Sequence, residues 1–324
     1  MKHINIAIVG NGNLGKACKQ QILKRPTEFN LVGVFSRRAG DDTIPFDDIT
    51  YFRKEIDVVL YCGGSNDDAP KFVPHLNKIG LSTVDSYDNH GEIANRSYQN
   101  FVATSADKSG TTAVIGAGWD PGYLSLQRIY NKAILPDAMH TTFWGGQSGG
   151  MSMGHTNAIK NIPGVLDAHQ ITLARPDAID DATQGKLVDK NNRHKRICYV
   201  VCKPENQASI ERQIRNMEGY FKGQEVEIHF KSPVDDATLF SQGELVKGYE
   251  FPYAHGGQII AVDDNAKINL QLDMKSNPLF TANAMLAFAK ANYVMQAKGL
   301  AGAFTIDQIP PEYLLDDDVR LGEI

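Results

Sequence analysis

The chain has 324 residues, of which 42% are hydrophobic and 22% charged, and its formal net charge is −5. This length is sufficient for two domains with a sizeable core. The acidic balance disfavours nucleic-acid binding, which usually requires a basic excess. No apolar stretch is long enough to span a bilayer, so we expect neither a nucleic-acid nor a membrane partner.

The first third of the chain alternates strand and helix patterns. Expected strands are residues 4–9, 30–36, 57–62, 82–86 and 112–118, and expected helices are residues 14–24, 68–79 and 92–109. This alternation is typical of an α/β fold, a Rossmann-type parallel sheet with helices on both faces. We expect this domain to cover residues 1–120.

The middle of the chain is richer in strands, several of them with period-two alternation. Expected strands are residues 139–146, 168–174, 195–203, 224–231, 257–264 and 267–275, with two helices near 153–161 and 207–217. This pattern predicts an α+β domain with a mostly antiparallel sheet over residues 121–294. An amphipathic helix over residues 279–298 is expected to pack between the domains, and residues 295–324 to pack back on the first.

The four cysteines have neither metal-ligand spacing nor a CxxC pair, and the N-terminus begins with a strand pattern instead of a signal peptide. We therefore expect buried free thiols, no metal site and a cytoplasmic location.

The stretch AIVGNGNLG, residues 7–15, follows a strand and opens a helix. In this context the glycines permit a tight turn and a close approach of a dinucleotide pyrophosphate, while the helix N-terminus offers N–H groups. The candidate cofactor-binding residues of this loop are Gly10, Asn11, Gly12, Asn13, Leu14 and Gly15.

The second expected strand ends in Ser36, Arg37 and Arg38. NAD sites usually have an acid here that accepts from the ribose 2′-hydroxyl, whereas arginines and a hydroxyl suit a 2′-phosphate. The segment therefore predicts NADP as the cofactor. Two solvated surface arginines are the alternative.

Ligands of open α/β sheets bind beyond the carboxyl ends of the strands, and three further segments follow strands here. After the third strand, the residues expected to approach the nicotinamide are Cys62, Gly63, Gly64 and Ser65. DSYDNH and GWDPG offer Asp88 and Asp120, with Trp119 adjacent. Two acids near a nicotinamide suit an ammonium group, which they can bind and from which one can take a proton. The residues alone equally allow these acids to cap helices or turns.

These motifs continue in order with TFWG, GHTNAIKNIPGV, HKR, HGG and NPLFTA. Over nearly its whole length the chain resembles the NADP-dependent meso-diaminopimelate D-dehydrogenases of lysine biosynthesis. The resemblance implies oxidative deamination at the D-centre of meso-2,6-diaminopimelate, yielding L-2-amino-6-oxopimelate and ammonium. It also implies a homodimer whose second domain binds substrate and forms the dimer contact.

The resemblance assigns roles to individual residues. It implies that Asp88 and Asp120 hold the D-amino group and that Trp144 lies against the substrate. The residues that it implies for the distal L-amino acid end are Thr172, Arg196, His255 and Asn277.

The chain departs from the family pattern between Trp144 and Gly154, where its loop is longer and Met153 replaces a usual glutamine. Met153 and Gly154 are candidate substrate-binding residues, and the loop glycines lead to the hypothesis of a lid over the substrate.

Two rival functions remain at this point. One is an NADP-dependent reductase acting on a cyclic or semialdehyde substrate, which leaves the paired acids unexplained. The other is an NADPH-sensing protein without chemistry, which fold alone does not exclude.

Overall fold

The computed structural model describes residues 3–38, 40, 42–64, 67–145, 149–231 and 255–315, without the side chain of Met153. The chain divides into two compact units. Unit 1 comprises Met1–Ile129 and Pro278–Ile324, and unit 2 comprises Tyr130–Asn277. Residues 121–129 and 278–294, expected in the second domain, thus belong to unit 1.

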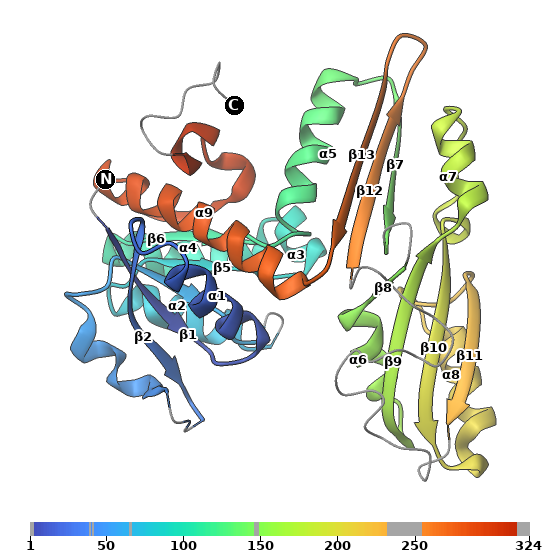
Figure 1. The fold of residues 1–324 in the computed structure, drawn as a ribbon, viewed down its shortest axis with the longest axis horizontal. Helices are drawn as coiled ribbons and strands as arrows, with labels where there is room; N and C mark the ends of the chain where they lie inside the picture. Colours follow the sequence, from blue (N-terminus) through green and yellow to red (C-terminus); the bar gives the residue numbers. More distant parts are fainter. Residues whose placement is uncertain are drawn as a thin grey trace. The chain divides into compact units, whose positions relative to one another are not determined.

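Unit 1 contains a seven-stranded sheet whose paired strands are all parallel (Figure 1). Its strands are β1 (Ile4–Val9), β2 (Phe29–Ser36), β3 (Ile44–Pro45), β4 (Val58–Tyr61), β5 (Thr83–Asp85), β6 (Thr112–Ile115) and β14 (Gly302–Thr305). Their order in the sheet is β14-β6-β5-β4-β1-β2-β3. The predicted Rossmann-type sheet is confirmed.

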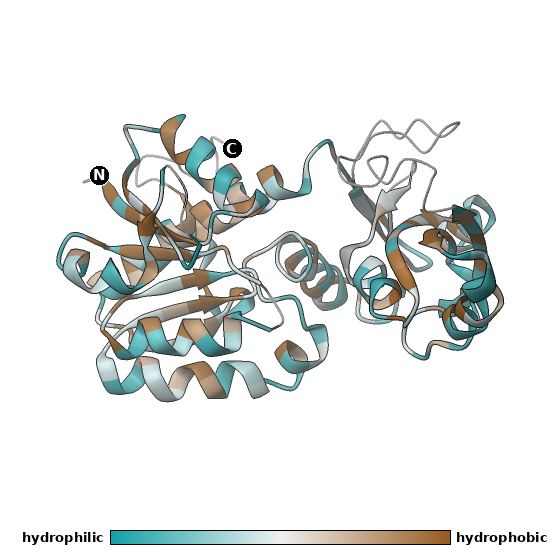
Figure 2. Cartoon of the chain, turned by 90° about the horizontal axis from the view of Figure 1, so that it is seen from below, coloured by the Kyte–Doolittle hydropathy of each residue, from teal (hydrophilic) through white to brown (hydrophobic). Residues whose placement is uncertain are grey.

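Helices cover both faces of this sheet, which is why its strands are hydrophobic on both sides (Figure 2). Helices α1 (Asn13–Leu23) and α9 (Asn277–Ala297) share one core with Ile4, Ile6 and Ile8. The alternate strand residues, such as Ala7 and Val9, face α2 (Ala69–Lys78) and α4 (Ser97–Ser109). The helix expected over residues 92–109 is divided into α3 (His90–Ala94) and α4 at Arg96, which has φ 61°.

Helix α9 was expected to pack between domains, but its buried residues belong to the core of unit 1. Met285, Leu286 and Ala289 are 0% exposed in that core. Asn292 donates through its side-chain amide to the carbonyls of Thr83 and Thr112, both at 3.0 Å. The apolar pattern of the helix predicted burial correctly, but it did not show which sheet the helix would cover.

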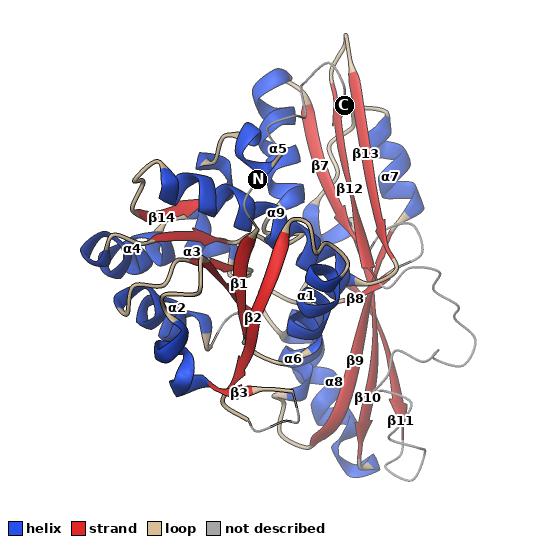
Figure 3. Ribbon diagram, turned by 60° about the vertical axis from the view of Figure 1, so that its left-hand side comes forward, coloured by secondary structure: helices blue, strands red, loops and turns tan. Residues whose placement is uncertain are grey.

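The described residues of unit 2 form two sheets instead of the single one expected (Figure 3). The four-stranded sheet has the order β11-β10-β9-β8, and the three-stranded sheet has the order β13-β12-β7. Their strands are β7 (Met139–Trp144), β8 (Gly150–Met151), β9 (Val165–Ala174), β10 (His194–Cys202), β11 (Glu225–Lys231), β12 (His255–Val262) and β13 (Lys267–Met274). Among the described strands of unit 2, only β10 and β11 pair in parallel, so the expected antiparallel character is largely confirmed.

Helices α6 (Met153–Lys160) and α8 (Gln207–Asn216), both expected, cover one face of the four-stranded sheet. Helix α7 (Pro176–Thr183) was not expected, and its Ala178 and Ala182 pack with Phe143 and Ile260 of the three-stranded sheet. Helix α5 (Tyr123–Ile134), also not expected, crosses the boundary between the units. Short 3-10 helices complete the described chain at Phe46–Phe52, Lys190–Asn192, Pro204–Asn206, Ile306–Gln308 and Pro311–Leu314.

Candidate active site

The glycine loop of unit 1 joins β1 to α1. The physical reason for a glycine differs from one position of the loop to the next. A Cβ on Gly10, which has φ 110°, would lie 2.7 Å from the carbonyl carbon of Cys62. A Cβ on Gly15 would lie 1.9 Å from the carbonyl oxygen of Gly10, so both positions require glycine for packing. Gly12 has nothing within 4 Å of its Cβ position.

Gly12 is also the N-cap of α1, and no side chain caps this helix end. Asn11 and Leu14 are half-buried, while Gly12 and Asn13 are exposed. Open space beside uncapped N–H groups and the positive end of the helix dipole is the arrangement that binds a pyrophosphate. The residues present therefore fit the phosphates of a dinucleotide.

The structure places Ser36, Arg37 and Arg38 together at the end of β2, but the two arginines differ. Arg37 forms an ion pair with Asp68, at the start of α2, and its guanidinium lies 4.6 Å from the ring centroid of Phe72. Arg38 is exposed, and its backbone N–H donates to the Ser36 hydroxyl at 3.2 Å. Sequence reasoning missed the Arg37 partner, which lies 31 residues away.

The backbone at the end of β4 packs against the glycine loop. Cys62 contacts Gly10 as described, and its thiol donates to the sulfur of Cys18 at 3.6 Å. This hydrogen bond and burial raise the pKa of the Cys62 thiol, so the group stays protonated. Gly63 and Gly64 follow, and Ser65 lies outside the described residues. The four cysteines are free and buried, as predicted.

Two acids of DSYDNH have contrasting environments. Asp85 is 1% exposed and accepts from the N–H groups of Tyr87 and Gly116 and from the hydroxyl of Tyr98. Burial raises the Asp85 pKa to about 6, against these hydrogen bonds, which lower it. Asp88, the candidate catalytic residue, is exposed at the same strand end. Asp85 therefore ties the ends of β5 and β6 together.

The GWDPG segment follows β6 and holds the second candidate acid. The Asp120 side chain is 1% exposed and is bound by both terminal nitrogens of Arg128 and, at 3.3 Å, by the Ser125 hydroxyl. Both partners lie on α5, which the sequence reasoning did not predict. Trp119 is half-buried beside Asp120. Hydrogen bonds on both carboxylate oxygens give this acid a defined orientation.

In unit 2, the pairing of β9 with β10 brings Thr172 opposite Arg196. The Arg196 guanidinium donates from Nη1 to the Thr172 hydroxyl and from Nε to Oε1 of Gln224 at 2.7 Å. Arg196 is only 7% exposed, and burial lowers its pKa to about 10. Two of the four residues expected at the distal end are thus in direct contact, and Gln224 was missed.

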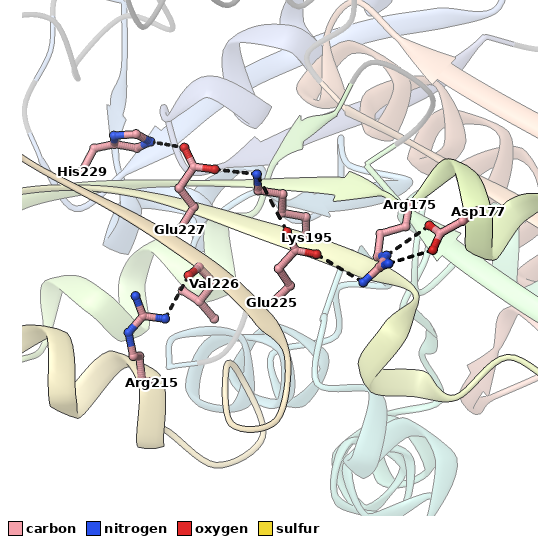
Figure 4. A network of polar contacts seen from close by, with 8 residues as sticks. All are labelled: Arg175, Asp177, Lys195, Arg215, Glu225, Val226, Glu227 and His229. Carbon is pink, nitrogen blue, oxygen red and sulfur yellow. Dashed lines mark hydrogen bonds and ion pairs between the residues drawn. The ribbon is translucent and has the colours of Figure 1, made fainter.

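Within the described part of the chain, no carboxylate lies within ion-pair distance of Arg196. The neighbouring Lys195, on the other face of the strand, instead contacts Glu225 and Glu227 of β11 (Figure 4). A buried guanidinium that has only neutral partners is a strong site for an anionic ligand, because a carboxylate can accept two parallel hydrogen bonds from it.

Trp144 ends β7 and is held by His194, another residue that the sequence reasoning missed. The Trp144 backbone N–H donates to Nε2 of His194 at 2.9 Å, and their ring centroids lie 5.7 Å apart. Burial, and then the positive charge of Arg196, lowers the His194 pKa to about 3, so this ring is a neutral acceptor.

His255 begins β12, the strand that pairs with β7. His255 is 8% exposed, and its Nδ1 accepts from the Gly256 N–H at 2.8 Å. The Gly256 carbonyl in turn accepts from the N–H of Gly145 at 2.8 Å, next to Trp144. This pairing brings the predicted His255 and Trp144 to the same end of the three-stranded sheet. Asn277, at the start of α9, is half-buried.

The loop between Trp144 and Gly154 is partly a strand. Gly150 and Met151 form β8, which pairs with β9 opposite Thr172 and Ile171. Gly154 is exposed in the first turn of α6, with nothing within 4 Å of its Cβ position. This α6 end therefore lies next to the strand that carries Thr172.

Comparisons with known proteins point to one family. A family model described as the diaminopimelic acid dehydrogenase C-terminal domain matches residues 118–275. A meso-diaminopimelate D-dehydrogenase of Corynebacterium glutamicum is 39% identical, with 98% of this chain and 97% of the relative covered.

Two solved structures are similar over the whole chain. The C. glutamicum DAP dehydrogenase in complex with DAP matches with a TM-score of 0.86 and 36% identity, covering 98% of this chain and 97% of the other. An engineered D-amino acid dehydrogenase bound to NADP⁺ matches with a TM-score of 0.81 and 35% identity, covering 99% and 98%.

Proposed function

The chain belongs to the meso-diaminopimelate D-dehydrogenase family, and on this premise we propose that it deaminates the D-centre of meso-2,6-diaminopimelate with NADP⁺. The products are L-2-amino-6-oxopimelate, ammonium and NADPH, and the reaction is reversible. It belongs to lysine biosynthesis by the dehydrogenase route. The observation that carries the substrate class is Arg196, a buried cation with neutral partners only among the residues described.

The proposed cofactor site is the surface of unit 1 from the glycine loop to the end of β2. The N–H groups at the start of α1 bind the pyrophosphate, and Ser36, Arg37 and Arg38 bind the 2′-phosphate. The residues proposed at the nicotinamide are Cys62, Gly63, Gly64 and Ser65. Bound NADP⁺ supplies a hydride acceptor, while the protein supplies position and charge.

The D-centre of the substrate is proposed to bind at Asp88 and Asp120, with Trp119 and Trp144 against its carbon chain. One of the acids takes a proton from the ammonium group. The carbon that bears the resulting amine can then release hydride to the acceptor and become a protonated imine. Water adds to the imine and ammonium departs. The ion pair with Arg128 supports this role for Asp120, because it orients the carboxylate.

The distal L-amino acid end is proposed to bind in unit 2. Arg196 and Thr172 bind the distal carboxylate, and His255 and Asn277 complete its polar contacts. Met153 and Gly154, in the first turn of α6, are proposed to bind the same end of the substrate. Such a demanding polar site rejects analogues that leave its buried groups unpaired.

We further infer that the protein is a homodimer of the cytoplasm. The family resemblance supports the dimer, and the four free, buried cysteines support a reducing compartment. In the described residues, no helix is long and apolar enough to cross a membrane.

The test is NADP⁺ reduction, followed by NADPH absorbance, with meso-diaminopimelate beside its LL and DD isomers, D-alanine and NAD⁺. We expect activity with the meso isomer and NADP⁺. Activity on D-alanine as well would mean that the segment around Met153 has relaxed the distal specificity. A folded protein that binds NADPH but oxidises none of them would favour the reductase or sensor alternatives.

A further inference from the structure

We propose that Gln224 is a positioning and specificity-determining residue, which orients the Arg196 guanidinium while leaving its charge available for the substrate's distal carboxylate. This inference rests on the proposed function, because it takes Arg196 as the distal carboxylate site.

Gln224 lies in the turn that leads into β11. The preceding Gly223 has φ 81°, a left-handed conformation that glycine adopts without strain. The Gln224 backbone N–H donates to the Phe221 carbonyl at 3.0 Å, which closes the turn. The position of this side chain is therefore set by the backbone of the turn.

The orientation of the Gln224 amide follows from its two partners. Its Nε2 donates to the Tyr220 carbonyl at 2.9 Å, and its Oε1 accepts from Nε of Arg196 at 2.7 Å. A carbonyl cannot donate and a guanidinium cannot accept, so the amide fits in only this orientation. Gln224 thereby occupies Nε, while Thr172 accepts from Nη1.

Strand register keeps the nearby acids away from Arg196. In the parallel pairing of β10 with β11, Glu225 lies opposite Lys195 and Val226 lies opposite Arg196. Side chains alternate between the faces of a strand. Glu225 and Glu227, which are two residues apart, therefore share the face that Lys195 occupies. Figure 4 shows these ion pairs.

The remaining titratable neighbours of Arg196 are the thiol of Cys198, whose pKa burial raises to about 12, and two neutral histidines. Burial, and then the charge of Arg196, lowers the pKa values of His155 and His194 to about 3. Every contact to the guanidinium from the described residues thus comes from a neutral group. A glutamate in place of Gln224 would still accept from Nε of Arg196 and would lose the donor to the Tyr220 carbonyl, but it would supply the missing charge from within the protein.

The experiment compares Gln224→Glu with Gln213→Glu, which makes the same charge change on an exposed face of α8. Substrates are meso-diaminopimelate and D-lysine, which lacks the distal carboxylate and is measured as substrate or competitive inhibitor. For Gln224→Glu we expect the KM for meso-diaminopimelate to rise about tenfold, since charge-assisted hydrogen bonds are lost. Its kcat and its affinity for D-lysine should stay unchanged, and Gln213→Glu should alter nothing.

Gln224→Met, which removes the acceptor and adds no charge, is the second variant. It should raise the KM for meso-diaminopimelate by less than Gln224→Glu does, because orientation is lost but the Arg196 charge is retained. An unchanged KM in Gln224→Glu, or an equal loss of D-lysine affinity, overturns the proposal. A wild-type protein inactive on meso-diaminopimelate overturns the proposed function itself.

Discussion

Asp120 of unit 1 and Arg196 of unit 2 are buried charges with opposite environments. In unit 1, the Asp120 side chain is 1% exposed and forms an ion pair with Arg128 of the same chain. In unit 2, Arg196 is 7% exposed and contacts the neutral Thr172 and Gln224. Asp120 thus has a counter-ion within the chain, whereas Arg196 has none among the described residues.

This difference indicates distinct roles for the two side chains: Asp120 is oriented for proton transfer, and Arg196 is available to bind the substrate. A carboxylate that is already paired is held in one geometry before any ligand arrives, which suits a group that handles protons. A buried cation without a counter-ion pays a desolvation penalty that a bound carboxylate offsets. We therefore expect mutations at Arg196 to affect substrate binding most, and mutations at Asp120 to affect turnover most.

The largest effect is expected for Arg196→Met, which removes the distal cation. Because an unpaired carboxylate is then buried, kcat/KM for meso-diaminopimelate should fall about 1000-fold. Arg215→Met, which removes an exposed arginine paired with Glu211 in the same unit, is the control and should have little effect. Similar losses in both variants would remove the distinction between the two arginines.

Asp120→Asn tests the compensated charge. We expect kcat to fall about 100-fold, the range of general acid–base effects, while the Kd for NADP⁺ stays unchanged. Steady-state kinetics and NADPH fluorescence titration measure the two quantities. Comparable losses in both would show that Asp120 supports the fold and not the chemistry.

Acidification should move the stabilities of the units in opposite directions. In unit 2, the pKa values of His155 and His194 are lowered to about 3, so the unfolded chain takes up protons first as the pH falls from 6.5. Each of these two histidines should cost about 1.4 kcal/mol of stability per pH unit below 6.5, so unit 2 should lose on the order of 6 kcal/mol between neutral pH and pH ~4. In unit 1, the Asp85 pKa is raised to about 6, so protonation of the native state adds stability over the same interval.

Urea unfolding at both pH values can report on each unit separately, because Trp119 lies in unit 1 and Trp144 in unit 2. The Trp144→Phe variant keeps only Trp119, which reports on unit 1. The Trp119→Phe variant keeps only Trp144, which reports on unit 2. When Asp85→Asn is added to the Trp144→Phe variant, the gain in unit 1 stability on acidification should disappear. If both units lost stability equally on acidification, the pKa contrast would be wrong.

The smallest effect is expected for Arg37→Ala combined with Arg38→Ala. The affinity for NADP⁺ should fall about tenfold, while that for NAD⁺ is spared, because only the 2′-phosphate contact is lost. Arg38→Ala alone should account for most of this loss, since Arg37 is already paired with Asp68. An unchanged cofactor preference would contradict the NADP assignment to this segment.

The sequence predicted the parallel sheet and most strands correctly, because their apolar runs and turn residues are local signals. It missed α5, α7 and β14, and it assigned α9 a place between domains. It also predicted one sheet in unit 2, where the described residues form two. Periodicity shows which residues are buried, but not which sheet they are buried against.

By itself, the sequence determined the glycine loop and the residues available for chemistry. Gly15 is required by the Gly10 carbonyl five residues earlier, and Gly10 by its own φ of 110° as well as by the distant Cys62. Arg196 and Thr172 were already candidates. Only the tertiary structure decided which charges are compensated. Asp120 with Arg128, Arg37 with Asp68, and Arg196 with Gln224 are pairs made by strand register and helix packing. The physical reason is that a backbone conformation depends on neighbours in sequence, whereas the environment of a charge depends on neighbours in space.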